Sequence, residues 1–328
     1  MRVLVVTNMY PTKEMPSFGT FVHKQVESLR REGLEVDVLF FNGRRSRLNY
    51  LWAFPRLWGR LLTRHYDVIH AHYVYSGIVA RAQLLCPVVL TQHGPEVFLP
   101  GLQARLCRLI GPLMDRVILV SEEQKVRGHL SKGEVIPCGI DFDLFRPMPK
   151  EEARERLNLP KDKKLVLWAG EYFRPEKRFE IVQQSVDLLR ERDRAVELVL
   201  VSKKPLEEVP QYMSACDVLV LVSDGEGSPM VIKEAMACNL PVVSVPAGDV
   251  RDVIGDTDGC YICSQEPRDV AQKLELALGR GRRTDGRERI AHLEIGFISR
   301  RIISLYEDLL KEKRRSRILS RLLFWHRT

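Results

Sequence analysis

Short apolar runs alternate along the chain with segments whose apolar residues recur at helical spacing. Residues 2–7 and 35–41 are such runs, rich in β-branched residues, and the spacing between them predicts a helix over residues 22–32 that Gly33 ends. Strand, loop, helix, glycine and strand in this order are typical of a parallel sheet covered by helices. The alternation continues through the chain, so the sequence predicts an α/β fold of doubly wound sheets.

Further strands and helices follow in the same manner. Apolar runs predict strands at residues 67–72, 88–93, 116–121, 165–169, 197–201, 218–222 and 240–245, and helical spacing predicts helices at residues 102–114, 178–190, 209–217, 229–238, 267–278 and 297–310. A chain of 328 residues, 45% of them hydrophobic, is long enough for two domains. Pro147, Pro149 and the charged residues after them predict a linker, which gives an amino-terminal domain at 1–147 and a second domain at 148–296.

The stretch from residue 218 to 245 has the most informative pattern. Residues 218–222 predict a buried strand, residues 224–227 a tight loop, and Ser228 the N-cap of a helix over residues 229–238. Asn239 follows in the position that favours a left-handed backbone. Because a loop after a parallel strand lies at the carboxyl edge of the sheet, the helix start should point into the crevice where such sheets bind ligands.

Two carboxylates belong to this loop and helix, Glu226 and Glu234. Backbone N–H groups at a helix start favour an anion, so Gly227 and Ser228 are candidates for contacting a phosphate. Glu234 can then accept hydrogen bonds from a polyol such as a ribose, while Glu226 reaches the group beyond the phosphates. The structural alternative is that Glu226 is a solvated loop carboxylate and Glu234 a surface helix residue.

The same stretch resembles the Glu-x7-Glu signature of the retaining family 4 (group 1) glycosyltransferases of GT-B fold. It reads Glu226-Gly-Ser-Pro-Met-Val-Ile-Lys-Glu234-Ala-Met-Ala-Cys-Asn-Leu-Pro-Val-Val, and Asn239 replaces the glycine that is usual in the family. The resemblance implies two Rossmann-like domains that face each other across a cleft. It also implies that a final helix, here residues 297–312, crosses back onto the first domain, which leaves residues 313–328 as a basic amphipathic tail.

Weaker matches to the family occur in the amino-terminal half. Residues 91–96, Thr-Gln-His-Gly-Pro-Glu, are similar to the T-x-H-G-x-[DE] loop, which implies that His93 faces the donor sugar. The first loop of the family brings a glycine close to the donor diphosphate, and Gly19 is the corresponding residue here. Residues 136–147 are similar to the I-P-N-G-[IV]-D segment where the chain leaves the first domain, with Cys138 in place of the usual Asn.

Three cations gather before the helix predicted at residues 178–190, namely Arg174, Lys177 and Arg178. Cations at a helix start oppose the helix dipole unless an anion lies between them, so this cluster suggests a phosphate site. The family pattern G-R-x-x-x-x-K implies that Lys177 contacts the donor diphosphate. Glu171 stands at the usual arginine position, and Arg174 is the candidate replacement.

Residues 43–66 form a basic segment with interleaved aromatic residues, six arginines and no acidic residue. Arg56, Arg60 and Arg64 recur on one face of a helix predicted from residue 55, beside an apolar face. Such a helix is typical of an anionic membrane surface or of a protein partner, and residues 313–328 have the same character. The alternatives are a helix that packs on its own domain with solvated arginines, and a disordered tail.

The charge and the cysteine content bear on the partners and on the cellular compartment of the protein. A formal net charge of +8 excludes neither nucleic acid nor an anionic membrane as a partner. Seven cysteines without disulfide-like spacing favour a reducing cytoplasm, and the isolated Cys260-x-x-Cys263 favours a structural role over zinc or redox chemistry. We see no secretory signal and no apolar run of the ~20 residues that cross a bilayer, so we expect any membrane contact to be peripheral, on the inner face.

A metal or cofactor is not expected. His70 and His72 share a strand face without a third ligand, and no Asp-x-Asp motif follows a strand. Cations and helix N–H groups should therefore stabilise the leaving diphosphate. The sole co-substrate that we expect is a nucleotide-diphosphate sugar.

The resemblance implies a glycosyltransferase that moves a sugar to an acceptor with retention of configuration. Basic aromatic surface on the first domain favours a lipid-linked or cell-surface glycan as acceptor, for example in polysaccharide biosynthesis. Three alternatives stay open. A GT-B sugar-nucleotide epimerase would convert its donor without an acceptor, a catalytically silent membrane-associated scaffold would not bind a donor, and a nucleic-acid-binding protein has only the charge in its favour.

Overall fold

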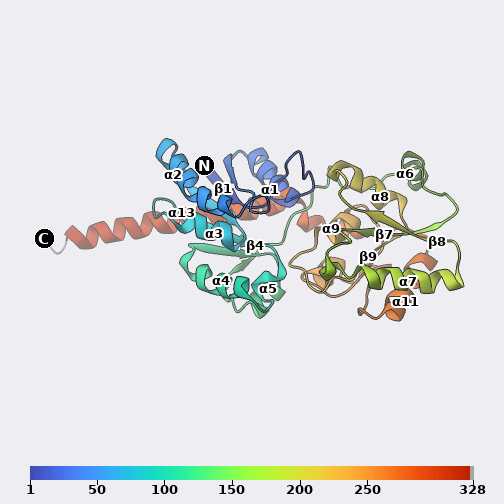
Figure 1. Cartoon of the computed structure of the whole chain (residues 1–328). Coiled ribbons are helices and arrows are strands. Elements are labelled where there is room, and N and C mark those ends of the chain that lie inside the picture. The colour runs from blue at the N-terminus through green and yellow to red at the C-terminus, as the bar shows by residue number, and fades with distance from the viewer. Residues whose placement is uncertain (326–328) are drawn as a thin grey trace.

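The computed structural model describes the backbone of residues 1–325 and the side chains of residues 1–316, and it contains two parallel sheets covered by helices (Figure 1). Alternate residues of the first strand belong to different cores. Val3 and Val5 pack with the helix at residues 20–31, whereas Leu4 and Val6 pack with the helix at residues 48–63. The strands are therefore buried on both faces, as the continuous apolar runs predict, and the doubly wound α/β prediction is confirmed.

The first sheet has the order β2-β1-β3-β4-β5-β6 with all neighbours parallel. Its strands are β1 (Arg2–Thr7), β2 (Glu35–Phe40), β3 (Val68–His72), β4 (Val88–Gln92), β5 (Arg116–Leu119) and β6 (Glu134–Val135). Its helices are α1 (Thr20–Arg31), α2 (Leu48–Thr63), α3 (Val74–Arg81), α4 (Leu102–Ile110) and α5 (Glu122–Arg127), with 3-10 turns η1 (Pro95–Val97) and η2 (Gly111–Leu113). We call this part of the chain the first unit.

The second unit is built on the sheet β11-β10-β9-β7-β8, which is also parallel throughout. Its strands are β7 (Lys164–Ala169), β8 (Val196–Val201), β9 (Val218–Leu221), β10 (Val242–Ser244) and β11 (Tyr261–Ile262). Its helices are α6 (Lys150–Arg156), α7 (Phe179–Arg192), α8 (Val209–Ala215), α9 (Met230–Ala237), α10 (Val250–Ile254), α11 (Pro267–Gly279) and α12 (Gly286–Arg289), with η3 (Pro175–Lys177), η4 (Leu206–Glu208) and η5 (Ala291–Leu293).

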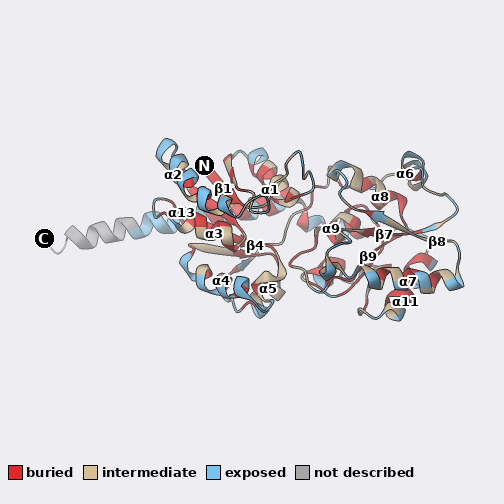
Figure 2. Cartoon of the chain, in the orientation of Figure 1, coloured by how far each residue is buried: buried red, intermediate tan, exposed pale blue. Residues whose placement is uncertain are grey.

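The final helix, α13 (Ile295–Trp325), runs from the second unit onto the first (Figure 1). The backbone N–H of Ile295 donates to the carbonyl of Ile140, and Ser299 Oγ donates to Ser28 Oγ of α1 over 2.8 Å. Apolar residues of α13 join the core that spans both units, which Figure 2 shows as buried ribbon in both units. The helix begins before residue 297 and continues through 313–325, where the sequence suggests a separate tail. The second membrane contact predicted there falls largely on side chains outside the described residues.

The charged run after Pro149 is helix α6, and its assignment to a linker is wrong. Arg154 is only 2% exposed and its guanidinium donates to the Ala215 carbonyl and to the Asp217 carboxylate, over 2.9 Å each. A buried guanidinium needs such acceptors. They lie about sixty residues further along the chain, so the local charge pattern gave no sign of them.

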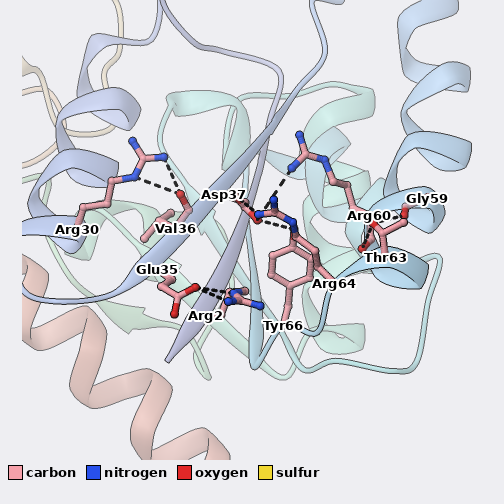
Figure 3. Close-up of polar contacts among 10 residues, drawn as sticks. All are labelled: Arg2, Arg30, Glu35, Val36, Asp37, Gly59, Arg60, Thr63, Arg64 and Tyr66. Atoms are coloured by element: carbon pink, nitrogen blue, oxygen red, sulfur yellow. Dashed lines mark hydrogen bonds and ion pairs between the residues drawn. The ribbon is translucent and has the colours of Figure 1, made fainter.

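Helix α2 begins at Leu48, not near Pro55, and contains this proline. Proline removes the hydrogen bond to the carbonyl four residues earlier, and here that residue, Leu51, is 65% exposed, so water can reach the carbonyl. Leu57 is buried against the sheet, whereas Arg60 and Arg64 lie beside Asp37 of β2 (Figure 3). Two of the three arginines on the predicted basic face are therefore paired within their own unit. Within the described residues, no helix is long and apolar enough to span a membrane.

Candidate active site

The candidate residues lie on loops at the carboxyl ends of neighbouring strands. The loops after β7 and β9 lie side by side because these strands pair directly, and the N–H of Asp224 donates to the Glu176 carbonyl over 2.9 Å. The loop after β4 faces them from the first unit. A Cβ added to Gly227 would collide with the carbonyl oxygen of His93, so only glycine allows the two units to approach this closely. The site thus lies where the two sheets face each other.

Lys177 and Glu226 meet at the centre of this region. Lys177 Nζ lies 2.6 Å from Glu226 Oε1, and the side chains are 20% and 16% exposed. The lysine comes from η3 and the glutamate from the loop before α9. Both groups keep access to solvent, so a ligand can reach either of them.

The neighbouring cations are also matched by carboxylates. Arg174 Nη2 lies 2.6 Å from Glu176 Oε1, and Arg178 Nε lies 2.7 Å from Asp224 Oδ1. Glu171 is farther from Arg174, at 4.0 Å. The cations predicted to hold a diphosphate are brought together, and each has an acidic partner.

Glu234 projects from α9 and is half-buried. Its carboxylate makes no side-chain hydrogen bond or ion pair with the described residues. Burial raises the pKa of this carboxyl to about 7. A partly buried carboxyl without a protein partner can accept hydrogen bonds from a bound hydroxyl group.

The start of α9 differs from the prediction. Its first residue is Met230 and no side chain caps it, so the N-cap role of Ser228 is wrong. Ser228 Oγ instead donates to Asp249 Oδ2 over 2.7 Å and accepts a hydrogen bond from Lys233 Nζ over 2.5 Å. Asn239 has a φ of 56° and confirms the left-handed position after the helix.

Lys233 is a buried residue that the sequence reasoning missed. Its side chain is 0% exposed, and Nζ lies 2.9 Å from Asp249 Oδ2 and 2.9 Å from the Cys138 carbonyl. With Ser228, the ammonium has three acceptors for its three protons. A charged residue within the otherwise apolar run Met-Val-Ile-Lys was the only sequence signal.

His93 is held between two side chains of the first unit. Its Nε2 lies 2.8 Å from His72 Nδ1, and its Nδ1 lies 3.6 Å from Cys138 Sγ. Burial lowers the pKa of His93 well below its usual range and lowers that of His72 to about 3. Both rings are therefore neutral near pH 7, and a ligand that displaces the long Cys138 contact at Nδ1 can hydrogen-bond His93 without adding charge.

Aromatic side chains surround His93. The ring centroid of Phe21, in the first turn of α1, lies 4.7 Å away, and that of Tyr73 lies 5.2 Å away. Tyr73 has a φ of 68°, which is unusual for a tyrosine, and the sequence reasoning missed it. Gly19, the residue before α1, has a φ of 73°, and a Cβ there would lie 2.5 Å from the Met9 carbonyl carbon.

Next to His93, His70 and His72 stack with ring centroids 4.4 Å apart. His70 is bonded on both nitrogens, by Tyr306 Oη at 2.5 Å and Thr91 Oγ1 at 2.7 Å. Among the described residues, no three His, Cys, Asp or Glu side chains form a group that could hold a metal ion. Because His70 contacts Tyr306 of α13 and His72 contacts His93, the stack connects α13 to His93.

Comparison with known families assigns both halves of the chain. Residues 2–144 match the family described as Glycosyltransferase Family 4, and residues 163–279 match Glycosyl transferases group 1. TuaC of Bacillus subtilis strain 168, a glycosyltransferase named for teichuronic acid biosynthesis, is 25% identical over 84% of this chain and 88% of its own length. A D-inositol 3-phosphate glycosyltransferase of Xylanimonas cellulosilytica is 28% identical over 71% of this chain and 69% of its own length.

Solved structures agree in fold. Sucrose-phosphate synthase of Thermosynechococcus elongatus superposes with a TM-score of 0.77 at 19% identity, covering 95% of this chain and 99% of that chain. HepE of Anabaena in complex with UDP-glucose has a TM-score of 0.68 at 16% identity, covering 94% of this chain and all of that chain. Both likenesses concern the two-unit GT-B architecture. The chain belongs to the group 1 glycosyltransferases of GT-B fold, with an amino-terminal half of the glycosyltransferase family 4 type.

Proposed function

We propose that this glycosyltransferase moves a sugar from a nucleotide-diphosphate donor to a lipid-linked or cell-surface glycan, in the cytoplasm, with retention of configuration and without a metal ion. The Lys177–Glu226 contact carries the proposal, because it joins a phosphate-binding cation to a sugar-binding acid across 2.6 Å. TuaC, named for teichuronic acid biosynthesis, supports a polysaccharide acceptor. The Glu-x7-Glu signature is the basis for expecting retention.

The proposed roles follow the order of groups in a nucleotide sugar. Glu234 accepts hydrogen bonds from the ribose hydroxyls, and Lys177 with Arg174 contacts the diphosphate. Gly19, Gly227 and Ser228 contribute backbone close to the phosphates. Glu226 and His93 contact the transferred sugar, where the neutral imidazole pairs with a hydroxyl group.

Donor binding then changes the ion-pair partners of Lys177 and Arg174. The diphosphate attracts Lys177 away from Glu226 and Arg174 away from Glu176, since these side chains hold each other in the free protein. Glu226 becomes free to accept hydrogen bonds from the sugar. As the bond to the diphosphate breaks, the cations and nearby N–H groups stabilise the developing negative charge, which is the largest contribution expected of such a site.

Calorimetric titration of UDP and GDP into the wild-type protein, with EDTA present, tests the donor site. We expect one nucleotide to bind, and Glu234→Ala to lose that binding while its unfolding curve stays cooperative. Lys177→Ala and Glu226→Gln should each lower sugar transfer by orders of magnitude. Failure of UDP, GDP, ADP and dTDP to bind would reject the proposal. Donor conversion without acceptor would instead indicate an epimerase.

A peripheral membrane contact through α2 is the second part of the proposal. The outward face of this helix exposes Leu48, Leu51, Trp52 and Leu62, whose exposed fractions are 61%, 65%, 64% and 79%. Apolar side chains of this kind insert into the headgroup region, and nearby arginines add attraction to anionic lipid. Flotation with anionic liposomes at low salt should carry the wild-type protein but not Trp52→Ser. A wild-type protein that stays at the bottom of the gradient would remove this contact.

A further inference from the structure

A cavity of about 650 Å³ lies beside α2, outside the proposed donor site. Its volume is in the range of small-molecule sites, roughly 300 to 1,000 Å³. Arg44, Arg45 and Arg56 line it together with Glu14. The cavity therefore offers three guanidinium groups and one carboxylate.

These three arginines lack the ion pair that Arg60 and Arg64 make with Asp37. None of them forms an ion pair with the residues whose side chains are described, and Arg56 donates only to the Phe40 carbonyl, over 3.2 Å. Directly after α2, Arg64 pairs with Asp37 (Figure 3), and its Nη1 lies 3.1 Å from Asp37 Oδ2. With Glu14 as the only acidic residue in the lining, the cavity keeps an excess of two positive charges.

The backbone that carries the arginines is fixed. Asn42 Oδ1 accepts hydrogen bonds from the N–H groups of Arg44 and Arg45, over 3.1 and 3.2 Å. Asn49 Nδ2 donates to the Asn42 carbonyl over 2.8 Å. The Arg44 guanidinium also lies 4.4 Å above the ring centroid of Phe18. The lining is thus ordered by contacts that involve no ligand, which lowers the entropy lost on binding.

The cavity is connected to the reaction region through the start of α1. Phe40 ends β2, so the lining lies at the carboxyl edge of the first sheet, where parallel sheets bind ligands. Phe18, whose ring lies beneath the Arg44 guanidinium, precedes Gly19 at the start of α1. Phe21, in the first turn of the same helix, has its ring centroid 4.7 Å from that of His93, so the start of α1 connects the cavity to the proposed sugar site.

We propose that this cavity binds an anionic group of the acceptor, a carboxylate or a phosphate on a saccharide. This inference names the chemical class of the acceptor, and it rests on the proposed transfer reaction. Guanidinium groups bind both anions through paired, charge-assisted hydrogen bonds, which neutral sugars cannot match. The acceptor is then selected by its charge in the first unit, while the second unit selects the donor.

The test uses the full chain and three probes: trigalacturonate, its fully methyl-esterified form, and glucose 6-phosphate, titrated calorimetrically at low salt. We expect trigalacturonate or glucose 6-phosphate to bind and the neutral ester not to bind. The tighter of the two anionic probes distinguishes a carboxylate from a phosphate. Added salt should weaken binding, because screening acts on exposed charges.

Variants assign the binding to the cavity. The double variant Arg44→Gln, Arg45→Gln should bind the anionic probe at least about ten-fold more weakly. Arg47→Gln is the matched control, since it removes the same charge from the same segment but does not line the cavity, and it should change affinity by less than about two-fold. Glu14→Gln should act in the opposite direction and tighten binding, because it removes the only acidic residue of the cavity lining.

Three results would overturn the inference. The first is that the ester binds as tightly as the anionic probes. The second is that the double variant binds the anionic probe as tightly as the wild type does. The third is that no saccharide binds, while the protein is retained on anionic phospholipid vesicles through Arg44 and Arg45. The last result would assign these arginines to a lipid contact. UDP and GDP titrations of the same double variant keep this test separate from the donor site, since nucleotide affinity should equal that of the wild type.

Discussion

Replacing Glu234 with glutamine tests the proposed ribose contact and the burial of this carboxyl in one experiment. Burial raises its pKa to about 7 in the folded protein, from a usual value of 4.5. As the pH rises from 4.5 to 7, the unfolded chain releases this proton first, so the unfolded state is favoured. Glu234 therefore lowers stability progressively over this range, and the loss is complete above pH 7.

The magnitude follows from the shift in pKa. The difference between the usual pKa of 4.5 and the folded-state pKa of about 7 corresponds to about 3 kcal/mol of unfolding free energy, of which about 2 kcal/mol develops between pH 5.5 and pH 8. Glutamine has no proton to release, so Glu234→Gln should gain about 2 kcal/mol relative to the wild type over this interval. Glutamine also replaces a charged acceptor by a neutral one, and nucleotide affinity should fall about ten-fold.

Urea unfolding at pH 5.5 and pH 8 measures the change in unfolding free energy, and calorimetric titration at pH 8 measures the nucleotide affinity. Glu191→Gln is the matched control, because Glu191 is exposed on α7 and should give the same small change at both pH values. A Glu234→Gln variant whose stability gain is equal at the two pH values would refute the burial argument. Wild-type nucleotide affinity in this variant would refute the ribose contact.

Three further substitutions examine other parts of the site. Lys233→Met leaves the Asp249 carboxylate buried without its cation, so unfolding free energy should drop by about 3 to 5 kcal/mol, and an unchanged urea midpoint would contradict the buried pair. Gly227→Ala places a methyl group against the His93 carbonyl. Sugar transfer should therefore be lost, while thermal unfolding stays cooperative. Retained transfer would show that the two units need not approach so closely. Tyr306→Phe removes one buried hydrogen bond to His70 and should cost about 1 kcal/mol in urea unfolding, whereas a neutral result would show that the bond adds no net stability.

Most strands could be predicted because parallel strands buried on both faces appear as continuous apolar runs. Predicted residues 2–7 and 165–169 agree with β1 and β7 to within one residue. Helices α3 and α5 were not predicted from the sequence, although α8 and α9, which are of similar length, were. Helix α6 escaped because its burial depends on acceptors from distant parts of the chain.

The site was predictable where its residues lie in one recognisable motif and less so where the fold assembles them. Glu226 and Glu234 belong to one continuous signature, and the structure places both at the loop and helix expected from it. Arg60 and Arg64 looked free because Asp37 is separated from them along the sequence and becomes their neighbour only through the β2–α2 packing. Pairing of this kind is not visible in a local charge pattern.

Two lysines near the proposed donor site differ in what they can do. Lys233 is fully buried and its three protons are matched by three acceptors, so a ligand could bind it only by breaking these bonds, of which the one to the Cys138 carbonyl joins the two units. Lys177 is 20% exposed and Glu226 is its one side-chain partner among the described residues. Two of its protons are thus available without disturbing the loops. The same positive charge is therefore buried and fully paired at Lys233, whereas at Lys177 it stays accessible to an anionic ligand.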